Sequence, residues 1–155
     1  MSGRVRRAVP ADAAALRALQ RYLPSPAPAL LDAALAGTLG DLFVAVADAP
    51  VGYVLAVDGD PPVPSGARSI ATGGSQRHIA ELVVAPSARR RGHASALLAT
   101  LLADRPDATL TLTVDPNNTA ARALYDRFGF TVAQELPGFF DGDPGLLLVR
   151  RPRAE

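Results

Sequence analysis

Several residue types that support common chemistries are missing from this sequence of 155 residues. It has no cysteine and only two histidines, which excludes a disulfide framework and a thiol nucleophile and makes a dedicated zinc site unexpected. Its formal net charge is +1, whereas domains that bind nucleic acid are usually strongly basic on one face. We therefore expect no resident metal and no nucleic acid as the main partner.

Long apolar runs are missing as well. No uninterrupted apolar stretch reaches the roughly eighteen residues that a membrane helix needs. The first residues are basic, but Asp12 and Arg17 interrupt the stretch that follows, which is unlike a secretory signal peptide. These absences predict a soluble, cytoplasmic protein with no membrane partner, and the length fits one domain with a sizeable core.

The most informative stretch is a strand, a basic turn and a helix in immediate succession. The strand Glu81–Ala85 ends at Pro86, and the basic turn Arg89–Gly92 follows. A turn of this kind directs backbone N–H groups, the positive end of the helix dipole and guanidinium groups to one place, which is typical of a site for a phosphate-bearing ligand. The apolar residues after the turn recur at the spacing of a helix with one buried face: Ala94, Leu97, Leu98, Leu101 and Leu102.

The spacing of the basic turn is R-x-x-G-x-A, from Arg89 through Gly92 to Ala94. It differs from the nucleotide P-loop and from the dinucleotide-binding fingerprint. It resembles the pyrophosphate loop, [RQ]-x-x-G-x-[GA], of the GNAT superfamily of acyl-CoA-dependent N-acyltransferases. Taken alone, the same residues also fit a surface arginine run before an ordinary helix, or a face that binds nucleic acid or protein.

A second segment points to the same superfamily. Thr109–Val114 alternates polar and apolar residues, as a half-buried strand does, and Asp115–Asn118 supplies turn and N-cap residues. The string N-x-x-A-x-x-L-Y-x-x-x-G-F, from Asn118 to Phe130, is similar to the other hallmark segment of the superfamily. In motif layout the chain is closest to ribosomal-protein alanine acetyltransferases and protein N-terminal acetyltransferases.

The resemblance covers essentially the whole chain and implies a single GNAT domain over residues 1–155. The implied fold is of the α/β (α+β) class, with one mixed, mostly antiparallel, splayed sheet of about seven strands flanked by about four helices. We expect long loops at Gly59–Ser75 and Gly138–Gly145, and a stiff connector at Pro24–Pro28. Strands are expected at 4–8, 42–47, 51–57, 78–85, 109–114, 130–132 and 146–149, and helices at 10–22, at 29–36 and after each motif strand.

The resemblance also implies acetyl-CoA as the acyl donor. In the superfamily, the strand before the pyrophosphate loop pairs its backbone with the pantetheine arm, and backbone N–H groups can stabilise an oxyanion without a side chain. The residues carried over for the pantetheine arm are Leu82, Val83, Val84 and Asn118. Those carried over for the pyrophosphate are Arg89, Arg90, Arg91, Gly92, His93, Ala94 and Ser95.

Tyr125 is the predicted catalytic acid, because it stands where the superfamily's tyrosine hydrogen-bonds the thioester sulfur and can protonate the leaving thiolate. Without that context it would be interpreted as a helix tyrosine packed in the core. The general base stays open, because the glutamate of ribosomal-protein alanine acetyltransferases is replaced here by Thr113. His78 and Glu81 are the candidates, although His78 also fits an exposed strand end and Glu81 a charge facing solvent. An α-amine, with its pKa of roughly 7.7–8.0, would need no strong base.

The acceptor is the least determined part of the prediction. Leu23, with Pro24, and the Phe139–Asp143 stretch resemble protein N-terminal acetyltransferases, in which a tyrosine pair before a D-G-[DE] turn helps to grip the peptide backbone. Leu23, Phe139 and Phe140 are therefore candidate acceptor-binding residues, but phenylalanine lacks the hydroxyls, and the pair also fits core packing. A peptide N-terminus and a small-molecule amine both remain possible acceptors. A catalytically weak CoA-binding module is a third hypothesis, and the protein could be a monomer or a homodimer.

Overall fold

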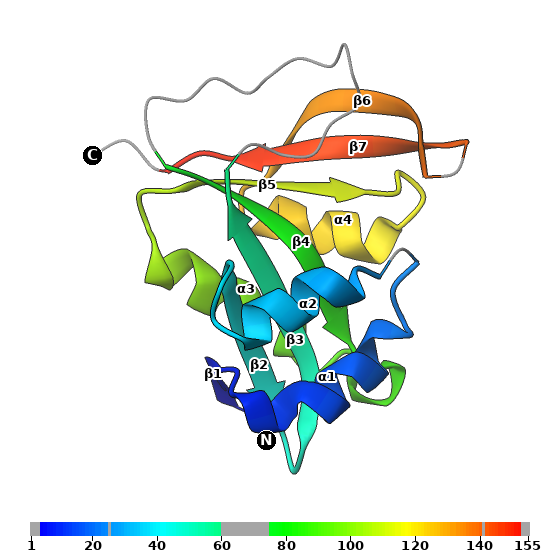
Figure 1. Ribbon diagram of the computed structural model, residues 1–155. Coiled ribbons are helices and arrows are strands. Elements are labelled where there is room, and N and C mark those ends of the chain that lie inside the picture. Colours follow the sequence, from blue (N-terminus) through cyan, green and yellow to red (C-terminus); the bar gives the residue numbers. More distant parts are fainter. Residues whose placement is uncertain (1–3, 25, 60–74, 141, 153–155) are drawn as a thin grey trace. The chain divides into compact units, whose positions relative to one another are not determined.

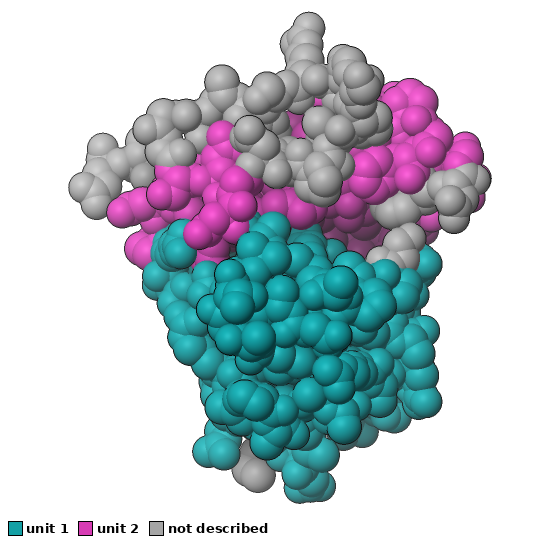
Figure 2. All heavy atoms as spheres, viewed as in Figure 1, with its two compact units in different colours: residues 1–57, 79–105 teal, residues 58–78, 106–155 magenta. Residues whose placement is uncertain are grey.

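The computed structural model describes residues 4–24, 26–59, 75–140 and 142–152 of the chain. They divide into two compact units, residues 1–57 with 79–105 and residues 58–78 with 106–155 (Figure 2). Seven strands follow one another in the hydrogen-bonding order β1-β2-β3-β4-β5-β7-β6. Strands β4 and β5 are parallel, whereas the pairs β1–β2, β2–β3, β5–β7 and β6–β7 are antiparallel. The predicted mixed, mostly antiparallel sheet of seven strands is therefore confirmed.

Figure 1 shows the helices and strands, coloured in their order along the chain. Two short 3-10 turns, at 10–12 and 86–88, complete the described elements. In chain order the elements are β1 (Arg4–Arg7), α1 (Ala13–Gln20), α2 (Pro28–Leu35), β2 (Asp41–Val46), β3 (Pro50–Asp58), β4 (Gln76–Val84), α3 (His93–Asp104), β5 (Thr109–Val114), α4 (Thr119–Arg127), β6 (Thr131–Phe140) and β7 (Asp143–Arg150).

The first unit is a sheet with helices on both faces. Helices α1 and α2 lie on one face (Figure 1). Their Leu16 and Leu31 pack against strand side chains that include Val44, Tyr53 and Val83. Neighbouring residues along β2 point to the opposite face, because strand side chains alternate, and α3 lies against β1 and β2. The buried residues of this second layer are Phe43, Ala45, Leu97, Leu98 and Leu101.

The beginning of the first helical region differs from the predicted single helix over 10–22. The Asp12 carboxylate accepts the Val9 N–H at 2.8 Å and two guanidinium N–H groups of Arg6 at 2.8 and 3.0 Å. The hydrogen bonds from Arg6 lower the pKa of Asp12. These bonds hold Pro10–Asp12 in a 3-10 turn, so that α1 begins at Ala13.

The second unit contains β5, the β6–β7 hairpin, α4 and the first three residues of β4. Residues Gln76–His78 pair in parallel with Thr109–Thr111, and β5 pairs in turn with β7. On the hairpin, Leu136, Leu147 and Val149 form a small buried cluster. This arrangement places the motif strand β5 directly before α4, as the sequence predicts.

The predicted loop over Gly138–Gly145 is wrong for most of its length. Strand β6 continues to Phe140, and β7 already begins at Asp143. Gly138 and Gly142 have φ angles of +69° and +97°, and the register shifts between Leu136 and Phe140. The glycines therefore permit an irregularity and a tight turn within a hairpin. Of the other predicted loop, residues 60–74 lie outside the described residues, as does Ser25 of the predicted connector.

Among the described residues, no helix has both the length and the apolar character that crossing a membrane requires.

Candidate functional site

The basic turn of the first unit follows β4 immediately. After Val84 the chain makes the 3-10 turn Pro86–Ala88 and then passes through three exposed arginines. The Arg89 Nε donates to the Val84 carbonyl at 3.1 Å, which ties the turn back to the end of the strand. Arg90 has a φ of +65°, a sparsely populated conformation for a residue with a side chain. Strain of this kind is concentrated at functional sites.

Gly92 makes the abrupt entry into α3 possible. Its φ of +82° lies in the left-handed region that favours glycine. A Cβ at this position would have no heavy atom within 4 Å, so glycine is required by its backbone conformation and not by crowding within the chain. The space beside Gly92 is therefore open, which is compatible with the phosphate contact predicted from the sequence motif.

The first turn of α4 has a side-chain cap, whereas that of α3 has none. In α3, Ala96 donates to the Gly92 carbonyl at 3.0 Å, and the three N–H groups before it, at residues 93–95, have no partner within the helix. In α4, the Asn118 Oδ1 accepts the Ala121 N–H at 3.2 Å and so caps the helix. The α3 terminus therefore offers backbone N–H groups, the helix dipole and exposed arginines to an anion.

His93 can contribute to that terminus through its backbone only. Its side chain is buried, although the motif places this residue among the pyrophosphate-binding positions. On β4 the side chain of Val83 is also buried and belongs to the core, while Leu82 and Val84 are half-buried. Their predicted role needs only main-chain atoms and is compatible with this packing.

Glu81 is the candidate whose surroundings differ most from the prediction. It is 5% exposed, so the interpretation as a charge facing solvent is wrong. Its carboxylate accepts hydrogen bonds from Gln20 Nε2 at 3.0 and 3.3 Å, from the Ala27 N–H at 2.8 Å and from the Tyr53 hydroxyl at 2.8 Å. Burial, together with the bond to Glu81, raises the pKa of Tyr53 well above its ordinary value, so its hydroxyl remains a donor. Sequence reasoning missed Gln20 and Tyr53, which no local pattern connects with Glu81.

Tyr125 lies in the second unit, on α4, and is 8% exposed. Its ring meets that of Phe130 edge to face, with the centroids 5.7 Å apart. Burial raises the pKa of Tyr125 to about 12. The phenol is therefore protonated at every physiological pH, so its hydroxyl can donate a hydrogen bond but cannot act as a phenolate base.

His78 is also buried, with 5% of its surface exposed, so the interpretation as an exposed strand end is wrong. Its Nδ1 lies 2.9 Å from the Thr111 Oγ1 on β5. Burial lowers the pKa of His78 to about 4. The imidazole is neutral at pH 7, and it is a weak base, because so low a pKa gives little driving force for accepting a proton.

Two further motif residues have clear structural roles. The Asp115 Oδ1 accepts the Asn117 N–H at 2.8 Å, which confirms the predicted turn. Asn118 is exposed and uses one side-chain oxygen as the cap of α4. Thr113, at the position of the missing glutamate, is half-buried on β5 and lies opposite Leu147 of β7.

The candidate acceptor residues pack partly into each unit's core. Leu23 is half-buried against the core of the first unit, and Phe139 packs against the hairpin cluster of Leu136, Leu147 and Val149. The backbone of Phe140 pairs with Asp143. The core packing that the sequence left open for the Phe pair is therefore seen for Phe139.

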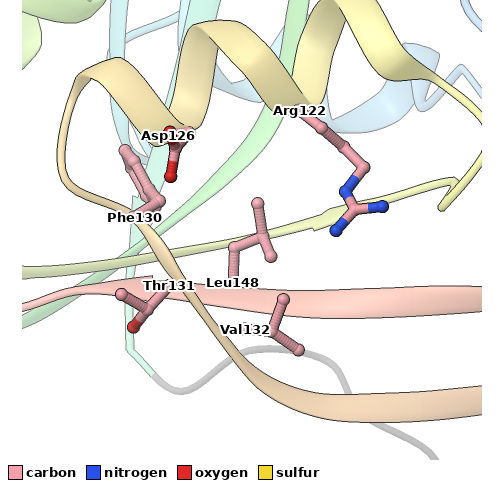
Figure 3. Close-up of a pocket in the computed structure, with 6 residues that line it drawn as sticks. All are labelled: Arg122, Asp126, Phe130, Thr131, Val132 and Leu148. Atoms are coloured by element: carbon pink, nitrogen blue, oxygen red, sulfur yellow. The ribbon is translucent and has the colours of Figure 1, made fainter.

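A surface cavity of about 290 Å³ in the second unit contains none of the predicted residues. Arg122 and Asp126 reach it from α4, and the other lining residues come from or precede β6 and β7 (Figure 3). It mixes two opposite charges with the apolar side chains of Phe130, Val132 and Leu148. Within the described residues, no group of three or more His, Asp or Glu side chains could hold a metal ion.

The burial of His78 predicts a pH-dependent stability. Its pKa is about 4 in the folded chain and about 6.5 when unfolded, so the unfolded state binds the proton first as the pH falls. Protonation of His78 in the unfolded state should therefore lower the free energy of unfolding by about 2 kcal/mol as the pH falls from 7.5 to 5. Urea unfolding of the wild type and of His78→Gln should show that the variant lacks this loss of stability. Both proteins keep His93, so the difference between them reports on His78. Parallel stability curves would contradict the burial of a neutral imidazole.

The comparisons with known proteins agree with the motifs and the sheet. The family model "Acetyltransferase (GNAT) family" matches residues 12–130. No match was found among the curated proteins, whereas many solved structures resemble this chain in fold.

Three of these structures span nearly the whole chain. NAA60 from Arabidopsis thaliana, in complex with a bisubstrate analogue, has 22% identity and a TM-score of 0.81 over 97% of this chain and 98% of its own. Naa50 from Arabidopsis thaliana, in complex with the bisubstrate analogue CoA-Ac-MVNAL, has 17% identity and a TM-score of 0.76 over 97% and 99%. A structure of "histone acetyltransferase HPA2 and related acetyltransferase" from Corynebacterium glutamicum has 25% identity and a TM-score of 0.73 over 100% and 99%.

These structural likenesses show the shared fold, and the family model covers the larger part of the chain. Together they confirm what the two motifs predict. The chain belongs to the acetyltransferase (GNAT) family and is an acetyl-CoA-dependent N-acetyltransferase.

Proposed function

We propose that the chain, acting as a single domain, transfers the acetyl group of acetyl-CoA directly to the α-amine of a peptide N-terminus in a ternary complex. The observation that carries the choice of acceptor is the weakness of His78 as a base. Its pKa is lowered to about 4, and the Glu81 carboxylate is already occupied by three donors. An acceptor that is partly neutral at working pH suits such an enzyme.

The donor would be held by the basic turn and the strand before it. The N–H groups of residues 93–95 and the exposed arginines at 89–91 suit the pyrophosphate and phosphate charges of CoA. The open space beside Gly92 lets a phosphate approach the main chain. The backbone of Leu82–Val84 and the amide of Asn118 are the proposed contacts of the pantetheine arm. The donor supplies an acyl thioester and a thiol leaving group.

In the reaction the amine nitrogen forms a bond with the acyl carbon, and the C–S bond breaks. The amine loses a proton to solvent or to a weak base, and the sulfur leaves as a thiolate that is finally protonated. The ordinary pKa of a thiol is about 8.5, whereas burial raises the pKa of Tyr125 to about 12. Complete proton transfer from Tyr125 would therefore be unfavourable, and its proposed role is to donate a hydrogen bond to the developing thiolate.

The choice between amines follows from their ordinary pKa values. At pH 7, roughly a tenth of an α-amine with a pKa near 8 is neutral, but only about one lysine side chain in 2,500 is. An enzyme without a strong base would therefore favour the α-amine by up to a few hundredfold, other contacts being equal.

The structural relatives support a peptide acceptor. The bisubstrate analogue in the Arabidopsis thaliana Naa50 structure, CoA-Ac-MVNAL, joins CoA, an acetyl group and a peptide. The Arabidopsis thaliana NAA60 structure also holds a bisubstrate analogue. A small-molecule amine is the second candidate acceptor, and it is favoured by the packing of Phe139 into the hairpin cluster, where the residue is less available to grip a peptide.

The acceptor class can be tested by the initial rate of CoA thiol release from acetyl-CoA. Three acceptors should be compared at pH 7: a lysine-free peptide with a free N-terminus, an N-acetylated peptide with one lysine, and a set of small primary amines. We expect the free N-terminus to react at least about tenfold faster than the lysine peptide, because of its larger neutral fraction. Turnover with small amines alone would favour the second candidate. Preference for lysine would contradict a weak-base enzyme.

The role of Tyr125 can be tested with Tyr125→Phe. The variant keeps the ring and its edge-to-face contact with Phe130, but it removes the hydroxyl. We expect kcat to fall about 100-fold, with the KM for acetyl-CoA and the melting temperature nearly unchanged. An unchanged kcat would show that Tyr125 serves packing alone.

A further inference from the structure

The Glu81 carboxylate lies at the meeting point of three elements of the first unit. Its donors come from Gln20, the last residue of α1, from Ala27, the residue before α2, and from Tyr53 on β3. All three are neutral, so the carboxylate is held by dipoles and by its place at the N-terminus of α2, where a negative charge is favoured. A buried charge needs such donors, because burying a carboxylate without partners is costly.

The acceptor positions of this carboxylate are filled. Each carboxylate oxygen has two lone-pair sites. Oε1 accepts from Gln20 and Tyr53, and Oε2 accepts from Ala27 and, more weakly, from Gln20. A general base must accept a proton from its substrate, and here a new proton would displace at least one of these donors. The geometry is therefore that of an anchor, a group that holds Gln20, Ala27 and Tyr53 in place through hydrogen bonds.

Two of the three donors flank one segment of the chain. Gln20 and Ala27 stand at the two ends of the connection between α1 and α2, whose described residues are Arg21–Pro24 and Pro26. Leu23, the candidate acceptor residue, lies within it and donates its N–H to the Gln20 carbonyl at 3.0 Å. On the other side, Glu81 directly precedes Leu82–Val84, the stretch proposed for the donor's pantetheine arm.

From these contacts we propose that Glu81 is a positioning residue that fixes the α1–α2 connection against β4 and thereby sets the affinity for the acceptor amine. This inference rests on the proposed function, with a peptide N-terminus as the acceptor, and on Leu23 as the acceptor-binding residue that the sequence predicts. It assigns to Glu81, Gln20 and the Ala27 N–H a role in acceptor affinity and removes Glu81 from the candidate bases.

Glu81→Gln and Glu81→Leu separate an anchor from a base. Glutamine keeps one oxygen for the Ala27 N–H, and its amide can donate to the Tyr53 hydroxyl and to a flipped Gln20 amide, so the connection stays anchored. Leucine has a similar volume but satisfies none of the donors. We expect Glu81→Leu to raise the KM for the acceptor about tenfold or more. We expect the acceptor KM of Glu81→Gln to stay within about threefold of the wild-type value. In both variants the KM for acetyl-CoA and the pH profile of kcat should be unchanged.

Glu135→Leu is the matched control, because it makes the same change at an exposed glutamate on β6, and it should leave the acceptor KM unchanged. Gln20→Leu tests the anchor with Glu81 still in place, and it should raise the acceptor KM in the same direction as Glu81→Leu. If Glu81→Gln abolishes kcat as completely as Glu81→Leu does, Glu81 acts as a base and the inference is overturned.

Amide hydrogen exchange provides a readout that does not depend on the acceptor. The Ala27 N–H and the neighbouring amides should exchange at least about tenfold faster in Glu81→Leu than in the wild type or Glu81→Gln, because the local opening free energy falls. Unchanged exchange in Glu81→Leu would overturn the anchor. If no peptide is acetylated but the exchange result holds, the proposed acceptor is wrong and the anchor stands as a structural role.

Discussion

The positive φ angle at Gly92 is the constraint on which the proposed donor site depends. It lets the chain pass from the basic turn into α3 with a glycine at the N-cap, which has no side chain to accept an N–H of the helix. Helix α4 differs, since the Asn118 side chain accepts one N–H of that helix's first turn. The uncapped α3 terminus and the arginines before it leave backbone donors and positive charge for a ligand, at the expense of an unfavourable backbone conformation at Arg90.

The chemistry follows from burial rather than from the presence of strongly reactive side chains. Burial moves the pKa of Tyr125 up and that of His78 down, so each remains in its neutral form around pH 7. Neutral groups can orient a reaction and stabilise a leaving thiolate, but they extract a proton from an ammonium poorly. The enzyme we infer therefore relies on binding two substrates side by side and on an acceptor whose own pKa supplies the nucleophile.

Sequence patterns predicted what is local and missed what is distant. The basic turn, the strand Thr109–Val114 and the Asn118 cap are encoded in consecutive residues, and the structure has all three. The half-buried character predicted for that strand is wrong, however, because its polar residues Thr109 and Thr111 are buried as well. The burial of Glu81 depends on Gln20, 61 residues away, and on Tyr53, 28 residues away, and no periodicity connects these positions. His78 is buried by a parallel pairing with β5 that places Thr111 beside it. The sequence predicts a loop at residues 138–145 because their glycines and proline resemble loop residues, although in the structure they occupy the irregular end of β6, a tight turn and the start of β7.

The dependence of kcat/KM on pH, measured for a peptide with a free N-terminus, tests the central claim most directly. If the acceptor's own neutral fraction supplies the nucleophile, kcat/KM should rise about tenfold per pH unit and level off near the α-amine's pKa, about 8. The inflection should also move when the peptide is replaced by one whose N-terminal amine has a different pKa. An inflection that stays at one pH whatever the amine would mean that a titrating group of the enzyme acts as the base, and it would contradict the mechanism.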